Sequence, residues 1–338
     1  MRYFNFKIYI IVLVALGMMA CQTKRDVFAG AEMTPQEVQI VRFDSAFVGV
    51  DTGRLQESVA LLYRNYPNFM PYFVSELLGL ENADSLVSVL PAFLSDTTLG
   101  IRRMIQDEQA QYADISSIQR ELNEAFTRLK YLYPDMTVPE VYLYVSGFVS
   151  PIYFPNEEII GIGTDMYLGS DYPAYAQLVY DYQKQTMRKE CMVGDAVSAY
   201  LFRKMPFNGK QNRLIDQMIY HGKIMYLLDQ LLTEEEEEQI IGYSREQWEW
   251  CEDHEGAIWR RIMDKRDLFQ TDQMVLTSYM NDGPFTSEVS QDSPGRLGTW
   301  VGWRIVESYM NNNEQVTIQQ LLDNEDAQNI LENSKYRP

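Results

Sequence analysis

The stretch "MIYHGKIMYLLDQLL", residues 218–232, determines how the whole chain is interpreted, because it has the pattern of a helix and contains one of only two histidines. Apolar side chains recur in and just before it at three- and four-residue steps. They form two adjacent rows, which consist of Leu214, Met218 and Met225, and of Ile215, Ile219 and Tyr226. So broad an apolar stripe predicts a helix that faces the core. Glycine lowers helix propensity by about 1 kcal/mol relative to alanine, so we expect Gly222 to let another element approach closely.

The same helix can be tested for the chemistry of a zinc peptidase. That chemistry needs three protein ligands, an open position for water and a carboxylate that takes the proton from this water. Two histidines four residues apart on a helix supply two ligands from one face. With His221 as the first ligand, the second position falls on Met225 and the base position on Gly222. A thioether is a poor zinc ligand and glycine has no side chain, so we expect no metal, no cofactor and no peptidase activity here.

The second histidine fails the same test. His254 is followed by Glu255, but the position four residues further on is Ile258. A different site that combines His221 with His254 and a neighbouring acid stays open as an alternative. The sequence contains no GxSxG, no P-loop and no convincing dinucleotide fingerprint. We therefore predict a protein that is not an enzyme.

The first residues have the pattern of a secretory signal. Arg2 and Lys7 precede an apolar run from Ile8 to Met19, which is shorter than the ~20 apolar residues of a membrane span. The sequence "MMAC" that ends in Cys21 looks like a bacterial lipobox. We therefore predict a signal peptide over residues 1–20 and a mature lipoprotein whose Cys21 carries acyl chains such as palmitate. An ordinary secretory signal with an incidental Cys21 is the alternative.

Residues 21–36 predict a tether between this anchor and a single domain over residues 37–338. Residues 22–36, "QTKRDVFAGAEMTPQ", are small, polar and poor in large apolar side chains, so we expect them to space the domain from the bilayer. About 300 residues lie at the upper edge of what one domain holds. We expect a lipid-anchored protein on the periplasmic side of the cell envelope, with inner and outer membrane both open.

The charge of the chain excludes one class of partner. Its net charge is −19 at pH 7, so it will not track the phosphates of a nucleic acid. Cys191 and Cys251 are left in the mature chain beside Cys21. We expect two buried free thiols, with a disulfide as the alternative in an oxidising periplasm.

The periodicity predicts an α+β fold that is predominantly helical and has a small β-sheet. Helical patterns and β-type runs are segregated along the chain rather than alternating. The β-type runs cover residues 38–44, 137–148 and 157–169, the last two joined by a Pro-rich link over 149–156. The helical patterns cover residues 53–66, 70–80, 114–134, 174–187, 194–205, 218–232 and 245–265.

An acidic run follows the opening stretch. Thr233 and Glu236 have the spacing of a capping box, and Ser244 and Gln247 repeat it before the helix over 245–265. Glutamates in a first helical turn suit the helix dipole. We interpret the run 234–238 as a solvated helix start rather than a cation site.

Several segments resemble the GldB-type gliding motility lipoproteins of Bacteroidetes. The resemblance covers residues 38–338 and is strongest in "NDGPFTSEVSQDSPGRLGTWVGWRIVESYM", residues 281–310, and "LENSKYRP", residues 331–338. The family in turn looks like a remote relative of zincin metallopeptidases. The resemblance implies a zincin-like fold whose HExxH metal site has degenerated in this chain.

The signature block contains the remaining candidates for function. Arg296 is a basic residue in an acidic chain and is followed by Trp300 and Trp303, a composition typical of interface anchors. The structural alternative is a buried helix packed against the sheet, with Gly298 and Gly302 allowing close approach. The candidate binding residues are His221, Tyr226, Arg296, Trp300 and Trp303.

The resemblance implies a role in gliding motility, envelope assembly or protein secretion, with other cell-envelope proteins as partners. In this interpretation, acyl chains hold an acidic scaffold at the membrane. The alternatives are a metal-dependent or peptidoglycan-directed hydrolase with an atypical site, and a receptor for a soluble ligand.

Overall fold

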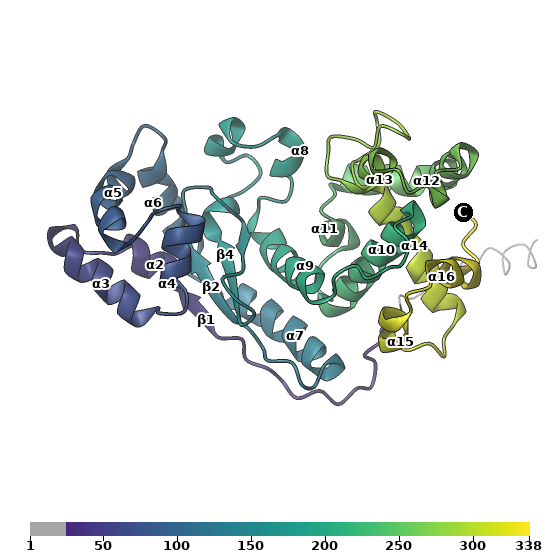
Figure 1. Ribbon diagram of the computed structural model, residues 1–338, viewed down its shortest axis with the longest axis horizontal. Helices are drawn as coiled ribbons and strands as arrows, with labels where there is room; N and C mark the ends of the chain where they lie inside the picture. The colour runs from purple at the N-terminus through teal and green to yellow at the C-terminus, as the bar shows by residue number, and fades with distance from the viewer. Residues whose placement is uncertain (1–24) are drawn as a thin grey trace, which may run out of the picture.

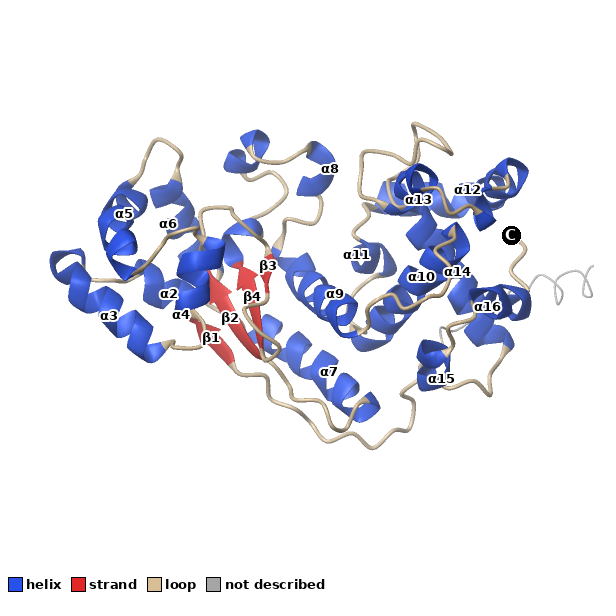
Figure 2. Cartoon of the chain, in the orientation of Figure 1, coloured by secondary structure: helices blue, strands red, loops and turns tan. Residues whose placement is uncertain are grey.

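A computed structural model of the protein describes residues 25–338 (Figure 1). The predicted signal peptide and Cys21 lie outside the described residues. The protein is α+β, with many helices around one small sheet (Figure 2).

The sheet has four strands in the order β1-β2-β4-β3. Strands β1, β2 and β4 are parallel, and β3 pairs antiparallel with β4. All three predicted β-type runs contain a strand, and the Pro-rich link adds β3, which the sequence did not predict. The bounds are β1 (Ile40–Arg42), β2 (Glu140–Tyr144), β3 (Ile152–Tyr153) and β4 (Ile159–Gly163).

Alternation along β2 divides the core into two parts. Tyr142 and Tyr144 join an aromatic cluster with helices on one face of the sheet, whereas Val141 and Leu143 join the main core on the other face. The helices on the aromatic side form what we call the N-terminal lobe, at one end of the long axis (Figure 1). They are α2 (Phe43–Val48), α3 (Leu55–Asn65), α4 (Met70–Tyr72), α5 (Ala83–Ser95) and α6 (Ile101–Gln111).

The main core joins the other face of the sheet to the C-terminal helices. Helices α7 and α9 lie between the sheet and these helices (Figure 1). The elements are α7 (Ser116–Leu132), α8 (Asp181–Lys184), α9 (Met192–Lys204), α10 (Leu214–Leu231), α11 (Glu237–Ile241), α12 (Arg245–Lys265), α13 (Gln273–Met280), α14 (Leu297–Asn312), α15 (Ile318–Asp323) and α16 (Ala327–Ser334).

Helix α10 contains the opening stretch and is almost entirely buried, as its apolar stripe predicted. It packs against α14, and the backbones meet at a pair of glycines. A Cβ added to Gly222 would lie 2.3 Å from the carbonyl carbon of Gly302. The predicted close approach at Gly222 is therefore confirmed, and α14 is its partner. The expectation that the signature block packs against the sheet is wrong, because α14 packs against α10, α13 and α16.

The N-terminal segment 25–38 lies against the domain. The Arg25 guanidinium donates to the carbonyl oxygens of Met310, Glu314 and Val316 at 2.7–3.0 Å, beyond and at the end of α14. Phe28 is buried, with the Arg128 guanidinium 5.4 Å from its ring centroid. From Arg25 onward, the predicted tether therefore packs against the domain and does not act as a free spacer.

Two local predictions are wrong for identifiable reasons. The pattern over 174–187 forms a 3₁₀ turn (Pro173–Gln177) and the short α8 instead of one helix. The capping box at Thr233 is absent, because the Thr233 hydroxyl donates to Glu124 and Glu236 caps α11. The capping box of Ser244 and Gln247 is present at the start of α12. Cys191 and Cys251 are both free and buried.

Candidate functional site

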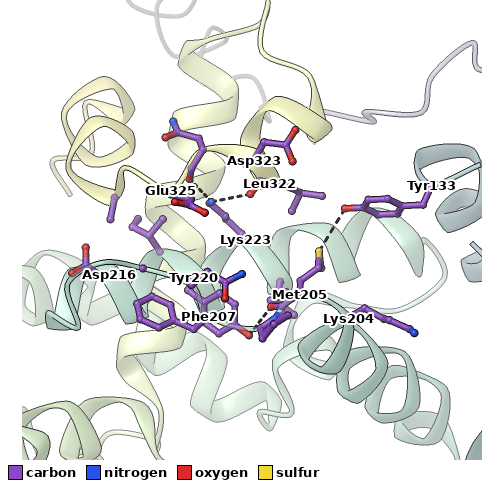
Figure 3. A pocket seen from close by; sticks show the side chains of 17 residues that line it. Tyr133, Lys204, Met205, Phe207, Asp216, Tyr220, Lys223, Leu322, Asp323 and Glu325 are labelled. Atoms are coloured by element: carbon purple, nitrogen blue, oxygen red, sulfur yellow. Dashed lines mark hydrogen bonds between the residues drawn. The ribbon is translucent and has the colours of Figure 1, made fainter. Parts of the chain in front are cut away.

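Two pockets lie beside α10. The larger, with a volume of about 340 Å³, is bounded by Lys223 and Tyr220 on one side and by the loop after α15 on the other (Figure 3). Two of its polar groups, Lys223 and Tyr220, already have partners. The Lys223 ammonium donates to the carbonyl oxygens of Leu322 and Asn324, and the Tyr220 hydroxyl donates to that of Met205. These bonds fasten the α15–α16 loop to α10, so we assign this pocket a structural role.

The second pocket, which we call the His221–Arg296 pocket, has a volume of about 210 Å³. Helix α9 provides Asp195 and Ser198, α10 provides His221 and Met225, and the start of α14 provides Arg296 and Thr299. The remaining lining residues are 240–242, Asp282, Tyr182, Gln183, Thr186, Phe202 and Met280. The fold thus brings together two of the five predicted binding residues, His221 and Arg296.

His221 is the central polar group of this pocket. Its ring lies 5.0 Å from that of Phe202 and 5.3 Å from that of Tyr220, and its nitrogens make no hydrogen bond to another described residue. Burial and, to a smaller extent, the nearby Arg296 charge together lower the pKa of His221 to about 4. The imidazole is therefore neutral at neutral pH, with one nitrogen able to donate and the other able to accept.

Arg296 precedes the first residue of α14 and has a left-handed backbone, with φ of +56°. A non-glycine residue in this region is uncommon and is held there by its surroundings. Its guanidinium donates to the carbonyl oxygen of Ile241 and lies 3.6 Å from the Asp282 carboxylate. These contacts keep a positive charge at the pocket wall.

Two further polar groups were not predicted from the sequence. The Asp195 carboxylate accepts a hydrogen bond from the Tyr167 hydroxyl at 3.0 Å, and burial raises the pKa of Asp195 to about 6. Thr299 is 2 % exposed, and its hydroxyl has no hydrogen-bond partner among the described residues. An acid between the small and apolar residues 192–197 was a signal for Asp195, whereas nothing in the sequence distinguished Thr299.

The other predicted binding residues lie outside this pocket. Trp300 and Trp303 are buried and pack edge-on against Trp248, at ring distances of 6.2 and 5.7 Å. Tyr226 is also buried, and its hydroxyl has no hydrogen-bond partner among the described residues. The structure therefore favours a packing role for both tryptophans over a role as surface anchors.

The chemistry of the pocket suits a polar organic group better than a metal ion. Met225 offers a thioether, and the Arg296 cation beside His221 opposes a second positive charge. Among residues 25–338, no three His, Cys, Asp or Glu side chains gather as a metal site requires. His254, on α12, stacks on Trp250 and donates from Nδ1 to the Trp250 carbonyl oxygen at 2.8 Å, and it does not line the His221–Arg296 pocket.

A comparison with known protein families assigns this chain to one of them. The family model of the gliding motility protein GldB matches residues 24–338, which include every described residue. The chain belongs to the GldB family. Neither the curated proteins nor the solved structures contain a match to it. In the described part of this GldB-family chain, no helix is both long and apolar enough to cross a membrane.

Proposed function

We propose that this GldB-family protein is a non-enzymatic lipoprotein of the gliding motility, envelope assembly or secretion machinery. Acyl chains on Cys21 hold it on the periplasmic side of a membrane, and its acidic domain binds another envelope protein. We also propose that its fold is that of a zincin whose metal site has degenerated. Family membership supports the motility role.

The contact between Gly222 and Gly302 supports the non-enzymatic role most directly. In a zinc peptidase helix, the residue after the first histidine is the glutamate base. At this position a Cβ alone would overlap the Gly302 backbone. A glutamate therefore requires α14 to move away from α10, which would open the most extensively packed helix pair of the core.

Complementation of a deletion strain tests this proposal. We expect His221→Ala to restore gliding or, in a host that does not glide, envelope integrity. Cys21→Ser should fail to do so, because the protein leaves the membrane. Immunoblots of membrane and soluble fractions verify that both variants accumulate. Loss of function in His221→Ala at normal abundance would contradict a pure scaffold.

Metal analysis tests the hydrolase alternative. A purified mature domain that binds one zinc per chain, loses it on His221→Ala, and cleaves peptide or peptidoglycan in a chelator-sensitive manner would replace the scaffold proposal. We expect neither zinc nor cleavage.

The unpaired Thr299 hydroxyl and the neutral His221 support a second candidate function, the binding of a small polar ligand in the His221–Arg296 pocket. Buried polar groups without partners are destabilising unless a ligand or water satisfies them. Native mass spectrometry of protein purified from the original host tests this idea. A bound mass that is lost on Thr299→Val would support it, and an unmodified mass would oppose it.

A further inference from the structure

The position of Arg25 limits where the domain can lie relative to a lipid anchor. The three carbonyl oxygens that its guanidinium contacts belong to the end of α14 and the turn before α15. Arg25 is half-buried, and the bonds are 2.7–3.0 Å long. They occupy one carbonyl group in the last turn of α14, of the kind that a helix end leaves unpaired, and two in the turn that follows. The chain is thus fastened to one definite place on the surface at its first described residue.

The residues that follow Arg25 also attach to the domain. Three backbone amides of the segment donate to side-chain oxygens of the domain. The Val27 amide donates to Gln230 at 3.0 Å. The amides of Gln36 and Val38 donate at 2.8 Å to Thr127 and Asn123 respectively. Figure 1 shows this segment running beneath α7 from β1 to α15. The attachment therefore holds both ends of the segment 25–38 and does not depend on one side chain.

Only three residues, Gln22 to Lys24, lie between Cys21 and Arg25, so the two are four Cα-to-Cα steps apart. A fully extended chain spans at most about 3.6 Å per step, so these four steps reach no further than about 14 Å. An acylated Cys21 lies at the bilayer surface. The Arg25 backbone must then lie within that distance of the lipid headgroups, and the end of α14 lies one arginine side chain further along.

This end of the molecule is opposite the N-terminal lobe. In Figure 1 helices α15 and α16 lie towards one end of the long axis, and α3 and α5 lie at the other. The chain is strongly acidic, with a net charge of −19, so anionic headgroups repel the parts that the anchor does not hold.

From this geometry, and resting on the proposed lipid anchor, we infer that the surface formed by the end of α14 together with α15 and α16 faces the bilayer. The lipid surface is its partner. The N-terminal lobe, α2 to α6, projects away from the membrane and is the part that other envelope proteins reach first.

Paramagnetic lipids test this orientation without a change in the folded domain. The mature chain from Cys21 is coupled at this cysteine to a maleimide lipid in nanodiscs of phosphatidylcholine with a minority of phosphatidylglycerol. Cys191 and Cys251 are buried and will not compete. With gadolinium on the headgroups, the methyl resonance of Met310, at the end of α14, should broaden strongly. Those of Met70 and Met104, in the N-terminal lobe, should not. Equal broadening of all three would overturn the inference.

A second experiment lengthens the segment between Cys21 and Arg25. Insertion of about 30 flexible Gly-Ser residues after Thr23, with a root-mean-square span of roughly 30 Å, should abolish the difference between Met310 and Met70. The same insertion after the exposed Thr98 should preserve it. An unchanged difference with the first insertion would show that the short link does not set the orientation.

The two proposals fail separately in these experiments. The lipid is attached chemically, so the absence of acylation in the cell would overturn the proposed anchor and leave the methyl gradient intact. Loss of the gradient in the anchored protein would overturn the orientation alone.

Discussion

Glu235 is partly buried, with its carboxylate turned inward, although it belongs to a run of five glutamates. Both of its carboxylate oxygens are inaccessible and have no hydrogen-bond partner among the described residues. One of them lies 3.0 Å from the position of a Cβ on Gly194, at the start of α9. The interpretation of the run as a solvated helix start is therefore wrong at this residue. Burial, with smaller contributions from the charges of Glu121 and Asp195, raises the pKa of Glu235 to about 8.

Replacement of Glu235 should change how stability depends on pH. The folded chain keeps a proton on Glu235 between its ordinary pKa of 4.5 and about 8, where the unfolded chain has released it. Folding stability therefore falls as pH rises through this window. Glu235→Gln stays neutral, so its free energy of unfolding should exceed that of the wild type at about pH 8.5 by roughly 2–4 kcal/mol and match it at about pH 4.5. Urea denaturation at both pH values measures this.

The neighbouring Glu234 supplies the matched control. It is exposed and pairs with Arg120 on the surface at 3.1 Å. Glu234→Gln should change stability by less than about 1 kcal/mol at either pH. An equal effect of the two substitutions would mean that the Glu235 carboxylate is solvated.

At the scale of elements, the crossing of α10 and α14 requires a glycine on each helix. A Cβ on Gly302 would lie 1.8 Å from the carbonyl oxygen of Met218, which belongs to the backbone and cannot rotate away. We expect Gly302→Ala to separate the helices and to lower the free energy of unfolding by roughly 2–4 kcal/mol. Guanidinium denaturation monitored by tryptophan fluorescence measures the lowered free energy of unfolding and also reports the changed environment of Trp303.

A glycine in another helix provides the comparison. Gly256 lies in α12, and the nearest atoms to an added Cβ are at 3.4 Å, in Pro338. Gly256→Ala should leave stability unchanged or raise it by about 0.5–1 kcal/mol through helix propensity. Comparable losses at Gly302 and Gly256 would contradict the close crossing.

Element boundaries followed the sequence wherever periodicity and capping signals agreed. Helix α12 covers the whole predicted range 245–265, with Ser244 and Gln247 capping it. The segment 174–187 has a similar apolar pattern but forms two short pieces, because the Tyr175 hydroxyl donates to the backbone oxygen of Asp165 and fixes the turn beside the sheet. A tertiary contact overrode local propensity there.

At the scale of the whole molecule, the first described residues stabilise the last third of the chain. Arg25→Ala removes three hydrogen bonds from a charged donor to carbonyl groups at the end of α14. We expect a loss of roughly 1–3 kcal/mol in the free energy of unfolding, with faster amide exchange in residues 310–316. Hydrogen exchange followed by mass spectrometry locates the effect.

Arg64→Ala is the control for the lost charge. Arg64 is exposed at the end of α3, far along the chain from α14. It should leave both the unfolding free energy and the exchange of residues 310–316 close to those of the wild type. Faster exchange at 310–316 in both variants would attribute the effect to net charge rather than to the contacts of Arg25.

The sequence by itself determined the helical and strand periods, the α+β class, the burial of α10 and the family. These follow from short-range patterns of apolar side chains and from a contiguous signature block. It also identified His221 and Arg296, whose residue types stood out. Only the tertiary structure decided that these two share a pocket with Asp195 and Thr299, that the Glu235 carboxylate turns inward, and that Arg25 joins the end of α14. Each of these depends on which segments meet across tens to hundreds of residues, and that is set by the packing of the whole core rather than by any local pattern.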